Sequence, residues 1–297
     1  MKKNSAFSLI ELSIVILIIG ILVAGVTQSS RLVAEMRLVT AQQLTKSSPV
    51  TSINNLALWL EATSDNSFAT GTAGTYTNVP KPDNNDAIGR WNDGNPQVIT
   101  KINALQATGA NQPNYITNSI NGLPALRFTN AASTNLSAAL DINYTVNPNM
   151  TFFIVFKRIG SAADQCIIGH DNGSWDRFIC AKHSAIAGSG GVSNGAAFST
   201  VANINSANIT LISLILQNSV SSGSNAYLNG GTATSFTESH GNSGYTSLGI
   251  GSIAAAAVGA SFDGDIGEII IFDRALKTEQ RQSIEKYLGQ KWGIKIS

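Results

Sequence analysis

Residues 7–26 read FSLIELSIVILIIGILVAGV, an apolar run as long as one membrane-spanning helix, whose fifth residue is the acidic Glu11. A bilayer core needs about 20 apolar residues in helical form, and a carboxylate near its centre costs about 2.5–3.5 kcal/mol. A helix satisfies its own backbone groups but not a charged side chain. Two interpretations of Glu11 therefore stay open: it pairs with a cation on another copy of this segment, or it lies close enough to the interface to stay solvated.

The residues around the start of this run carry a resemblance. The basic pair Lys2-Lys3, followed by Ser5–Leu12 and an unbroken apolar helix, resembles the processing and assembly segment of type IV pilins and pseudopilins. The resemblance implies that residues 1–6 are a leader, which a prepilin peptidase removes between Ala6 and Phe7. It also implies methylation of the new Phe7 amine and pairing of Glu11 with that amine on a neighbouring subunit. Ala6 stands where the family usually has glycine.

The helical pattern continues beyond the apolar run. Leu32, Met36 and Val39 recur at helical spacing, and Pro49 is the first residue that cannot continue the helix. We therefore expect one transmembrane and assembly helix over residues 7–48, roughly 60 Å long at about 1.5 Å per residue.

Charge and composition limit the location and the partners. The chain has 43% hydrophobic and 12% charged residues and a formal charge of +1, so it can bury a core and has no basic face for nucleic acid. Lys2-Lys3 before the apolar run predicts a cytoplasmic amino terminus with the remainder exported. We expect a single-pass inner-membrane precursor, and afterwards a periplasmic or extracellular filament.

Short apolar segments separated by Gly, Asn, Ser and Thr dominate residues 49–297 and predict an all-β head domain. Several segments, such as Phe152–Phe156, are apolar at every position, which predicts strands covered on both faces. Two stacked antiparallel sheets, with a helix packed outside them, would cover such strands. We expect this closing helix to have Thr278 as its N-cap and to end at Gly293. The expected strands are Leu56–Glu61, Leu123–Phe128, Thr151–Arg158, Gln165–His170, Trp175–Ala181, Ile209–Gln217, Asn225–Leu228, Thr246–Ile250 and Ile266–Asp273.

A second resemblance covers nearly all of the head. Five segments, which follow one another along the chain, together resemble concanavalin A-like, laminin G-like jelly-roll domains of bacterial surface proteins. The resemblance implies that fold, but that family includes carbohydrate binders, calcium-dependent adhesive modules and inert spacers. The pieces are Leu56–Ala62, Arg90–Gly94, Leu105–Thr108 with Gln112-Pro113, Ile120–Phe128, and Gly264–Leu276 followed by a helix to Lys291–Gly293.

Cys166 and Cys180 are the only cysteines and lie seven residues either side of Gly173. A hairpin closed there would bring them together, and an exported domain permits a disulfide. We expect this bond; the alternative is a pair of small buried apolar residues.

Asp263, Asp265 and Glu268 are the sharpest catalytic candidates, because some jelly-roll glucanases resemble this spacing of acids on one strand. On a regular strand, however, Glu268 faces away from the two aspartates, and a retaining carboxylate pair would need a β-bulge before it. We expect no catalytic site and no enzyme activity.

The sequence evidence for a metal site or a sugar-binding site is weaker than that for the catalytic candidates. The three histidines lack metal-ligand spacing, so we expect no cofactor; calcium at Asp83 and Asp86, or at Asp263 and Asp265, is the alternative to hydrated surface acids. Trp91 or Trp175 would stack on a sugar ring if exposed, and would belong to the core if buried.

Three functions remain in competition. The preferred hypothesis is a structural subunit that self-assembles through its helix into a filament or pseudopilus and displays a lectin-like head. The alternatives are a minor or tip adhesin that binds carbohydrate and a tethered glycosidase. A surface pilus and a secretion pseudopilus are not distinguished.

Overall fold

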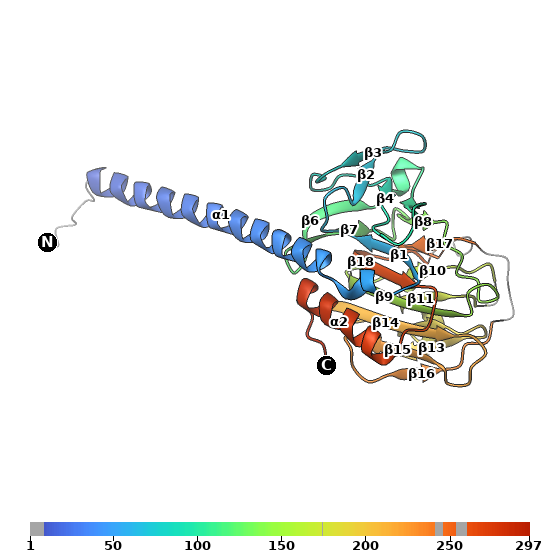
Figure 1. Ribbon diagram of the computed structural model, residues 1–297. Coiled ribbons are helices and arrows are strands. Elements are labelled where there is room, and N and C mark those ends of the chain that lie inside the picture. Colours follow the sequence, from blue (N-terminus) through green and yellow to red (C-terminus); the bar gives the residue numbers. More distant parts are fainter. Residues whose placement is uncertain (1–8, 174, 241–245, 254–259) are drawn as a thin grey trace.

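The computed structural model describes residues 9–173, 175–240, 246–253 and 260–297. A long helix, α1 (Leu9–Lys46), projects from a β-rich head, and a second helix, α2 (Thr278–Trp292), lies against the head beside the end of α1 (Figure 1). The chain is therefore a mostly β sandwich with a helix at each end. Short 3₁₀ turns cover Pro49–Ser52, Gly109–Asn111 and Ser184–Ile186.

The first sheet packs next to the helices, and eight described strands form it. Every pair in it is antiparallel. Its order is β16 (Thr234–Phe236), β15 (Ser224–Leu228), β14 (Ile209–Gln217), β9 (Asn149–Arg158), β18 (Gly264–Phe272), β7 (Leu123–Phe128) and β6 (Asn114–Ile120), with β1 (Leu56–Glu61) also on β18.

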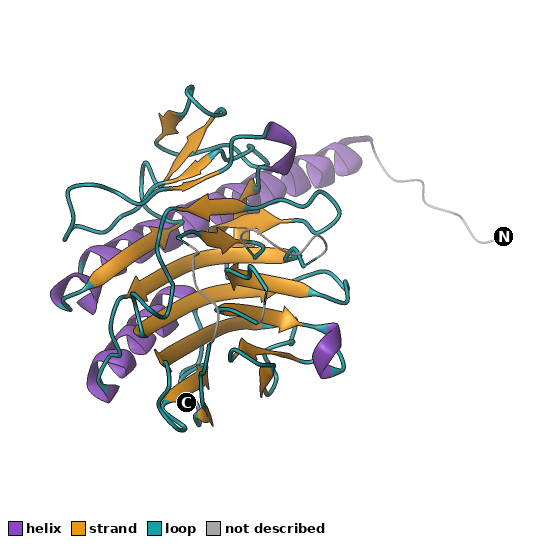
Figure 2. Cartoon of the chain, turned by 90° about the vertical axis from the view of Figure 1, so that its right-hand side faces the viewer, coloured by secondary structure: helices purple, strands orange, loops and turns teal. Residues whose placement is uncertain are grey.

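The second sheet is antiparallel as well and consists of ten shorter described strands, the other layer of the sandwich (Figure 2). Its order is β13 (Phe198–Val201), β12 (Gly190–Ser193), β11 (Phe178–Lys182), β10 (Gln165–Gly169), β17 (Leu248–Ile250), β8 (Leu136–Ala138), β5 (Ala104–Leu105), β4 (Arg90–Trp91), β2 (Phe68–Thr70) and β3 (Thr77–Val79).

Strand β18 organises the first sheet. One edge pairs with β9, while the other edge pairs with β7 over Gly264–Ile266 and with β1 over Glu268–Phe272. A bulge lies between Ile266 and Glu268, where β18 passes from one partner to the other. All nine residues of β18 and seven consecutive residues of β9 are buried, which confirms the expectation of strands covered on both faces.

Helix α2 supplies the outer cover of the first sheet. Ile284, Leu288 and Trp292 recur at helical spacing and are buried. Gly293 ends the helix with a left-handed φ of 65°, as expected, but Thr278 is not the N-cap. Lys277 holds that position and Thr278 begins the helix, because the side chain of Gln280 accepts the Lys277 backbone N–H.

Sequence periodicity located the long strands better than the short ones. Leu56–Glu61, Leu123–Phe128 and Ile209–Gln217 have the expected bounds. The expectation of a strand from Trp175 was wrong, since β11 begins at Phe178. Trp175 has a left-handed φ of 61°, which an extended strand does not permit.

Candidate functional site

The outer part of α1 exposes a large apolar surface. The described Leu, Ile and Val side chains from Leu9 to Val23 have exposed fractions between 47% and 86%. A soluble monomer rarely exposes a contiguous apolar patch beyond a few hundred Å². This surface therefore requires an apolar partner.

The inner part of α1 has two different faces. Ala41 and Thr45 are buried against the head, whereas Leu32, Met36 and Val39 remain exposed. The exposed apolar surface of α1 thus continues towards the head along the side that the head does not cover.

The predicted processing and assembly residues lie at the far end of this helix. Ala6 and Phe7 lie outside the described residues. Glu11 belongs to α1, but its side chain is not described. None of the helices in the described part of the chain is long and apolar enough to cross a membrane.

Polar contacts fix the base of α1 to the head. Gln42 Nε2 donates to the Thr63 carbonyl at 3.0 Å. The Tyr287 hydroxyl of α2 lies 3.4 Å from Thr45 Oγ1 and donates to Glu268 Oε1 at 2.8 Å. Burial and the neighbouring carboxylates Glu268 and Glu61 raise the pKa of Tyr287 well above its usual value, so the phenol stays a proton donor.

Beneath α2 lies a buried ion cluster that joins the helix to the sheet. Lys291 Nζ donates to Glu61 on β1 and, at 2.8 Å, to Glu268 on β18. Glu61 and Glu268 are directly opposed across the two strands. Burial alone would raise the pKa of Glu61, but Lys291 and hydrogen bonds from its neighbours outweigh it and lower that pKa. Lys291 therefore neutralises one of two facing buried carboxylates.

Two indole groups complete the hydrogen bonding of Glu268. Trp59 Nε1 donates to its Oε1 and Trp292 Nε1 to its Oε2, both at 2.8 Å. The sequence had indicated Glu268 only as a catalytic candidate. Structural donors, including Lys291, hydrogen-bond to its oxygens. The sequence placed Lys291 in the closing piece of the jelly-roll resemblance but gave no sign of its pairing with Glu268, because the two residues are 23 positions apart and meet only after folding.

The other catalytic candidates have separate neighbours. Asp265 is fully buried and accepts two hydrogen bonds from Arg127, from Nε to Oδ1 and from Nη2 to Oδ2, both at 2.8 Å. Ser119 Oγ donates to Asp265 Oδ2 as well, at 2.5 Å. The backbone carbonyl of Asp263 accepts the N–H of Ile159. The strand does contain the bulge that the catalytic interpretation required, yet Asp265 and Glu268 each belong to a different hydrogen-bonded cluster.

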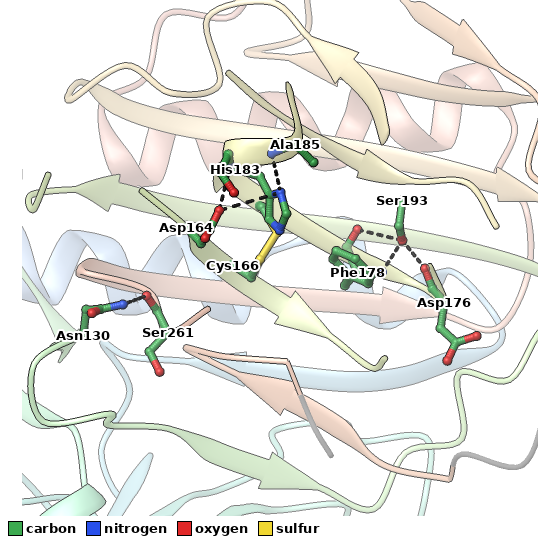
Figure 3. Close-up of a disulfide and its surroundings, with 11 residues drawn as sticks. Asn130, Asp164, Cys166, Asp176, Phe178, His183, Ala185, Ser193 and Ser261 are labelled. Carbon is green, nitrogen blue, oxygen red and sulfur yellow. Dashed lines mark hydrogen bonds and ion pairs between the residues drawn. A yellow bond between two sulfur atoms is a disulfide. The ribbon is translucent and has the colours of Figure 1, made fainter. Parts of the chain in front are cut away.

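Cys166 on β10 and Cys180 on β11 form a disulfide between these neighbouring strands (Figure 3). Both cysteines are fully buried. Their surroundings include the half-buried rings of Trp175 and Phe198, which pack against this second, smaller core cluster. The bond therefore links β10 covalently to β11 in the half of the second sheet next to these rings.

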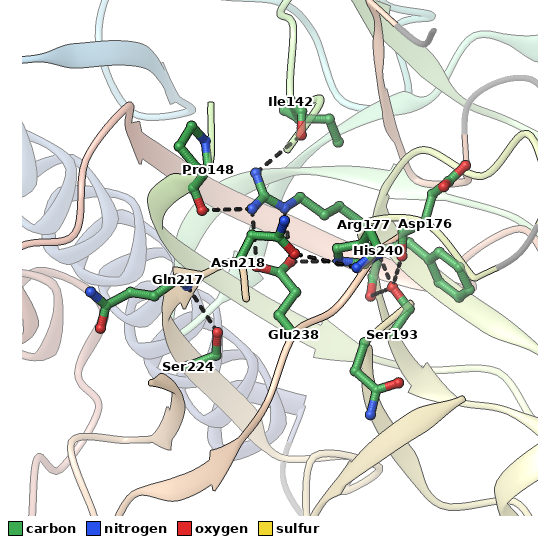
Figure 4. A network of polar contacts seen from close by, with 12 residues as sticks. Ile142, Pro148, Asp176, Arg177, Ser193, Gln217, Asn218, Ser224, Glu238 and His240 are labelled. Carbon is green, nitrogen blue, oxygen red and sulfur yellow. Dashed lines mark hydrogen bonds and ion pairs between the residues drawn. The ribbon is translucent and has the colours of Figure 1, made fainter. Parts of the chain in front are cut away.

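A second buried ion cluster joins the residue before β11 to the segment that follows β16 (Figure 4). Arg177 donates to both oxygens of Glu238, at 2.8 and 2.9 Å, and also to carbonyls of the loop at 142–148. His240 Nε2 lies 2.7 Å from Glu238 Oε1. Burial would raise the pKa of Glu238, but His240 and Arg177 outweigh it and lower that pKa. Arg177 and Glu238 thus hold three loops together.

The other candidate ligand sites are placed as follows. Trp91 is fully buried in the core, whereas Trp175 is partly exposed. Asp83 and Asp86 form a local turn in which Asp86 Oδ2 accepts the Asp83 N–H. Within the described residues, no group of three or more His, Cys, Asp or Glu side chains is arranged to hold a metal ion.

One family model matches the start of the chain. Residues 1–27 match the prokaryotic N-terminal methylation motif, which confirms the resemblance of this segment to type IV pilins and pseudopilins. No curated protein matches the chain.

The solved structures that align with this chain are distant from it in sequence. An α-L-arabinofuranosidase soaked with a cyclic sulfate inhibitor has a TM-score of 0.51 at 10% identity, over 80% of this chain and 63% of its own. The sialidase of Trypanosoma rangeli has a TM-score of 0.48 at 11% identity, over 85% of this chain, and the chain spans 38% of its length. Domain 4 of an extracellular arabinanase from Geobacillus stearothermophilus, in complex with arabinotriose, has a TM-score of 0.44 at 15% identity, over 78% and 98% of the two chains.

Proposed function

We propose that this protein is a structural subunit of a type IV pilus or pseudopilus, assembled through α1, with its β-sandwich head displayed on the outside. The observation that carries the proposal is the methylation motif at residues 1–27 on a helix whose apolar side chains are exposed and directed away from the head. The head is then a concanavalin A-like jelly roll. The precursor is anchored in the inner membrane before assembly.

Assembly in this proposal buries the apolar side chains of α1 between subunits. Burial stabilises by about 25 cal/mol per Å² of apolar surface, so a helix exposed over most of its length supplies a large driving force. Glu11 meets the free amine of Phe7 on a neighbouring subunit, and this charge-assisted pair sets the register of the helices.

Processing is tested by the intact mass of the protein recovered from membranes and from filaments. We expect a mature chain that begins at Phe7 and carries one added methyl group. A mature protein that retains Met1 to Ala6 would contradict this part of the proposal.

Assembly is tested with Glu11→Ala in the full chain, with sheared filaments quantified by immunoblot and electron microscopy. We expect at least about a tenfold loss of filaments, the loss for one buried charge-assisted hydrogen bond. Glu35→Ala is the matched control, because Glu35 is an exposed acid on the same helix. Filaments at normal yield from Glu11→Ala would refute the pairing.

The buried carboxylates of β18 support a structural head without hydrolytic activity. The Asp265 carboxylate accepts hydrogen bonds from Arg127, and the Glu268 carboxylate accepts them from Lys291 and two indole N–H groups. Release of reducing sugar from polysaccharide that disappears in Glu268→Gln, in a variant that keeps its fold, would contradict this view and favour the tethered glycosidase.

One cluster favours the second candidate function, a carbohydrate-binding adhesin. Trp175 lies edge-on to Phe198 at 5.1 Å between ring centroids, and Phe198 lies 4.6 Å from the ring of His183. All three side chains are partly exposed, and a bulky residue at the left-handed φ of Trp175 is strained, as residues at functional sites often are. Aromatic rings held in this way suit stacking on a sugar ring.

A glycan array probed with the full chain in detergent tests the adhesin. We expect binding that is lost in Trp175→Ala and retained in Trp175→Phe, which keeps an aromatic face. Equal binding by all three proteins would place any carbohydrate site elsewhere, and no binding by the wild-type chain would remove this candidate.

A further inference from the structure

A groove of about 420 Å³ lies between the inner part of α1 and the head. Val33 and Leu44 of α1 line one wall, and Asn121 in the β6–β7 turn and Leu123 at the start of β7 line the other. The lining is mainly apolar, and the groove opens on the side of α1 next to its exposed apolar residues. Its opening is therefore continuous with the proposed assembly surface.

Arg37 supplies a positive charge in this groove. Its guanidinium lies over the β6–β7 turn, where a Cβ on Gly122 would come within 2.8 Å of Nη1. Of the ion pairs formed between described residues, none includes Arg37. An occupant of the groove with apolar side chains and one acid would complement both features.

The chain itself contains such a segment. Glu11 is the only acidic residue among residues 1–34, and its described neighbours Leu9, Ile10 and Leu12 are exposed apolar side chains. We propose that the groove receives the first turns of α1 from a second copy, and that Arg37 of one copy pairs with Glu11 of the other. This inference rests on the proposed assembly function and deepens it by naming the docking site.

The proposed contact defines an axial offset between two subunits. Glu11 and Arg37 are 26 residues apart, so their pairing displaces parallel copies by about 39 Å along the helix axis at about 1.5 Å per residue. Pairing of Glu11 with the Phe7 amine displaces two copies by only about 6 Å, because 4 residues separate them. The two contacts therefore join different neighbours. One carboxylate can accept both, since it has two oxygens.

Photo-cross-linking identifies the occupant of the groove. A photoreactive phenylalanine analogue at position 40, which lines the same groove and leaves Arg37 in place, is irradiated in intact filaments of the full chain, and the cross-linked peptides are mapped by mass spectrometry. We expect cross-links to residues 9–18 of a second copy. Cross-links that map only to the head, or their absence from filaments that otherwise assemble, would overturn the inference.

Charge variants test the role of Arg37. We expect Arg37→Gln to reduce filament yield about tenfold, as loss of one charge-assisted hydrogen bond predicts, and Arg37→Lys to retain most of it. Lys46→Gln is the matched control, because it removes the same charge from an exposed position at the end of the same helix. Normal assembly of Arg37→Gln would overturn this inference and leave the proposed function standing, whereas failure of the wild-type chain to assemble would overturn both.

Discussion

Replacing Lys291 by methionine removes the cation between Glu61 and Glu268 and keeps a long apolar side chain in its place. The Lys291 and Glu268 side chains are fully buried, and that of Glu61 is 5% exposed. Removal of one partner from a buried ion pair costs about 3–5 kcal/mol, because a buried charge is left without compensation. Here two facing carboxylates are left. We expect the free energy of unfolding to fall by about 4 kcal/mol at pH 7, which lowers Tm by about 10 °C in a domain of this size.

The same substitution changes the pH dependence of stability. In the wild-type protein the pKa of Glu61 is lowered, so its contribution is present above the ordinary glutamate pKa and is lost as the pH falls through the lowered value. In Lys291→Met the buried Glu61 has lost its cation, so burial raises its folded-state pKa and folding takes up a proton. The variant therefore gains stability relative to the wild type as the pH falls from 7 to about 4.5.

Urea unfolding of the full chain in detergent, followed by tryptophan fluorescence, measures both effects. Trp59 and Trp292 donate to Glu268 and report directly on the cluster. Lys286→Met is the control, an exposed lysine on the same helix, and should shift stability by less than about 0.5 kcal/mol. A Lys291→Met variant within about 1 kcal/mol of this control at pH 7, or an equal deficit at both pH values, would refute the reasoning.

Two further predictions concern packing and the disulfide. Gly267→Ala should destabilise by about 1–3 kcal/mol, because its Cβ would come within 2.6 Å of the Trp292 ring, while Gly109→Ala, which meets no atom within 4 Å, should be nearly neutral; equal urea midpoints for these two variants would count against the packing argument. Reduction of Cys166–Cys180 should lower stability by about 2–4 kcal/mol, and a Tm that is unchanged by reductant under unfolding conditions would show that the bond adds nothing.

Much of the head could be predicted from local pattern, because long strands have a periodicity that neighbouring residues enforce. The bounds of β1, β7 and β14 followed from apolar runs between turn residues. Strands of two or three residues, such as β4 and β5, are too short to show any period. They extend only because their partners in the sheet supply the hydrogen bonds.

The candidate site likewise has one part that the sequence predicts and one part that depends on folding. The apolar run and Glu11 predicted an assembly helix, because a charge in an apolar segment requires explanation wherever the segment lies. The groove at Arg37 could not be predicted, since it joins α1 to a turn more than 80 residues further along the chain.

By itself, the sequence determined the long helix, its methylation motif and the β-rich character of the head, since all three depend on residue type and short-range spacing. Only the tertiary structure decided what the acids of β18 do. The bulge at Gly267 and the packing of α2 place Lys291 between Glu61 and Glu268, and the pairing of β7 with β18 places Arg127 beside Asp265. A charged side chain takes its role from the groups that surround it after folding, and those groups come from distant parts of the chain.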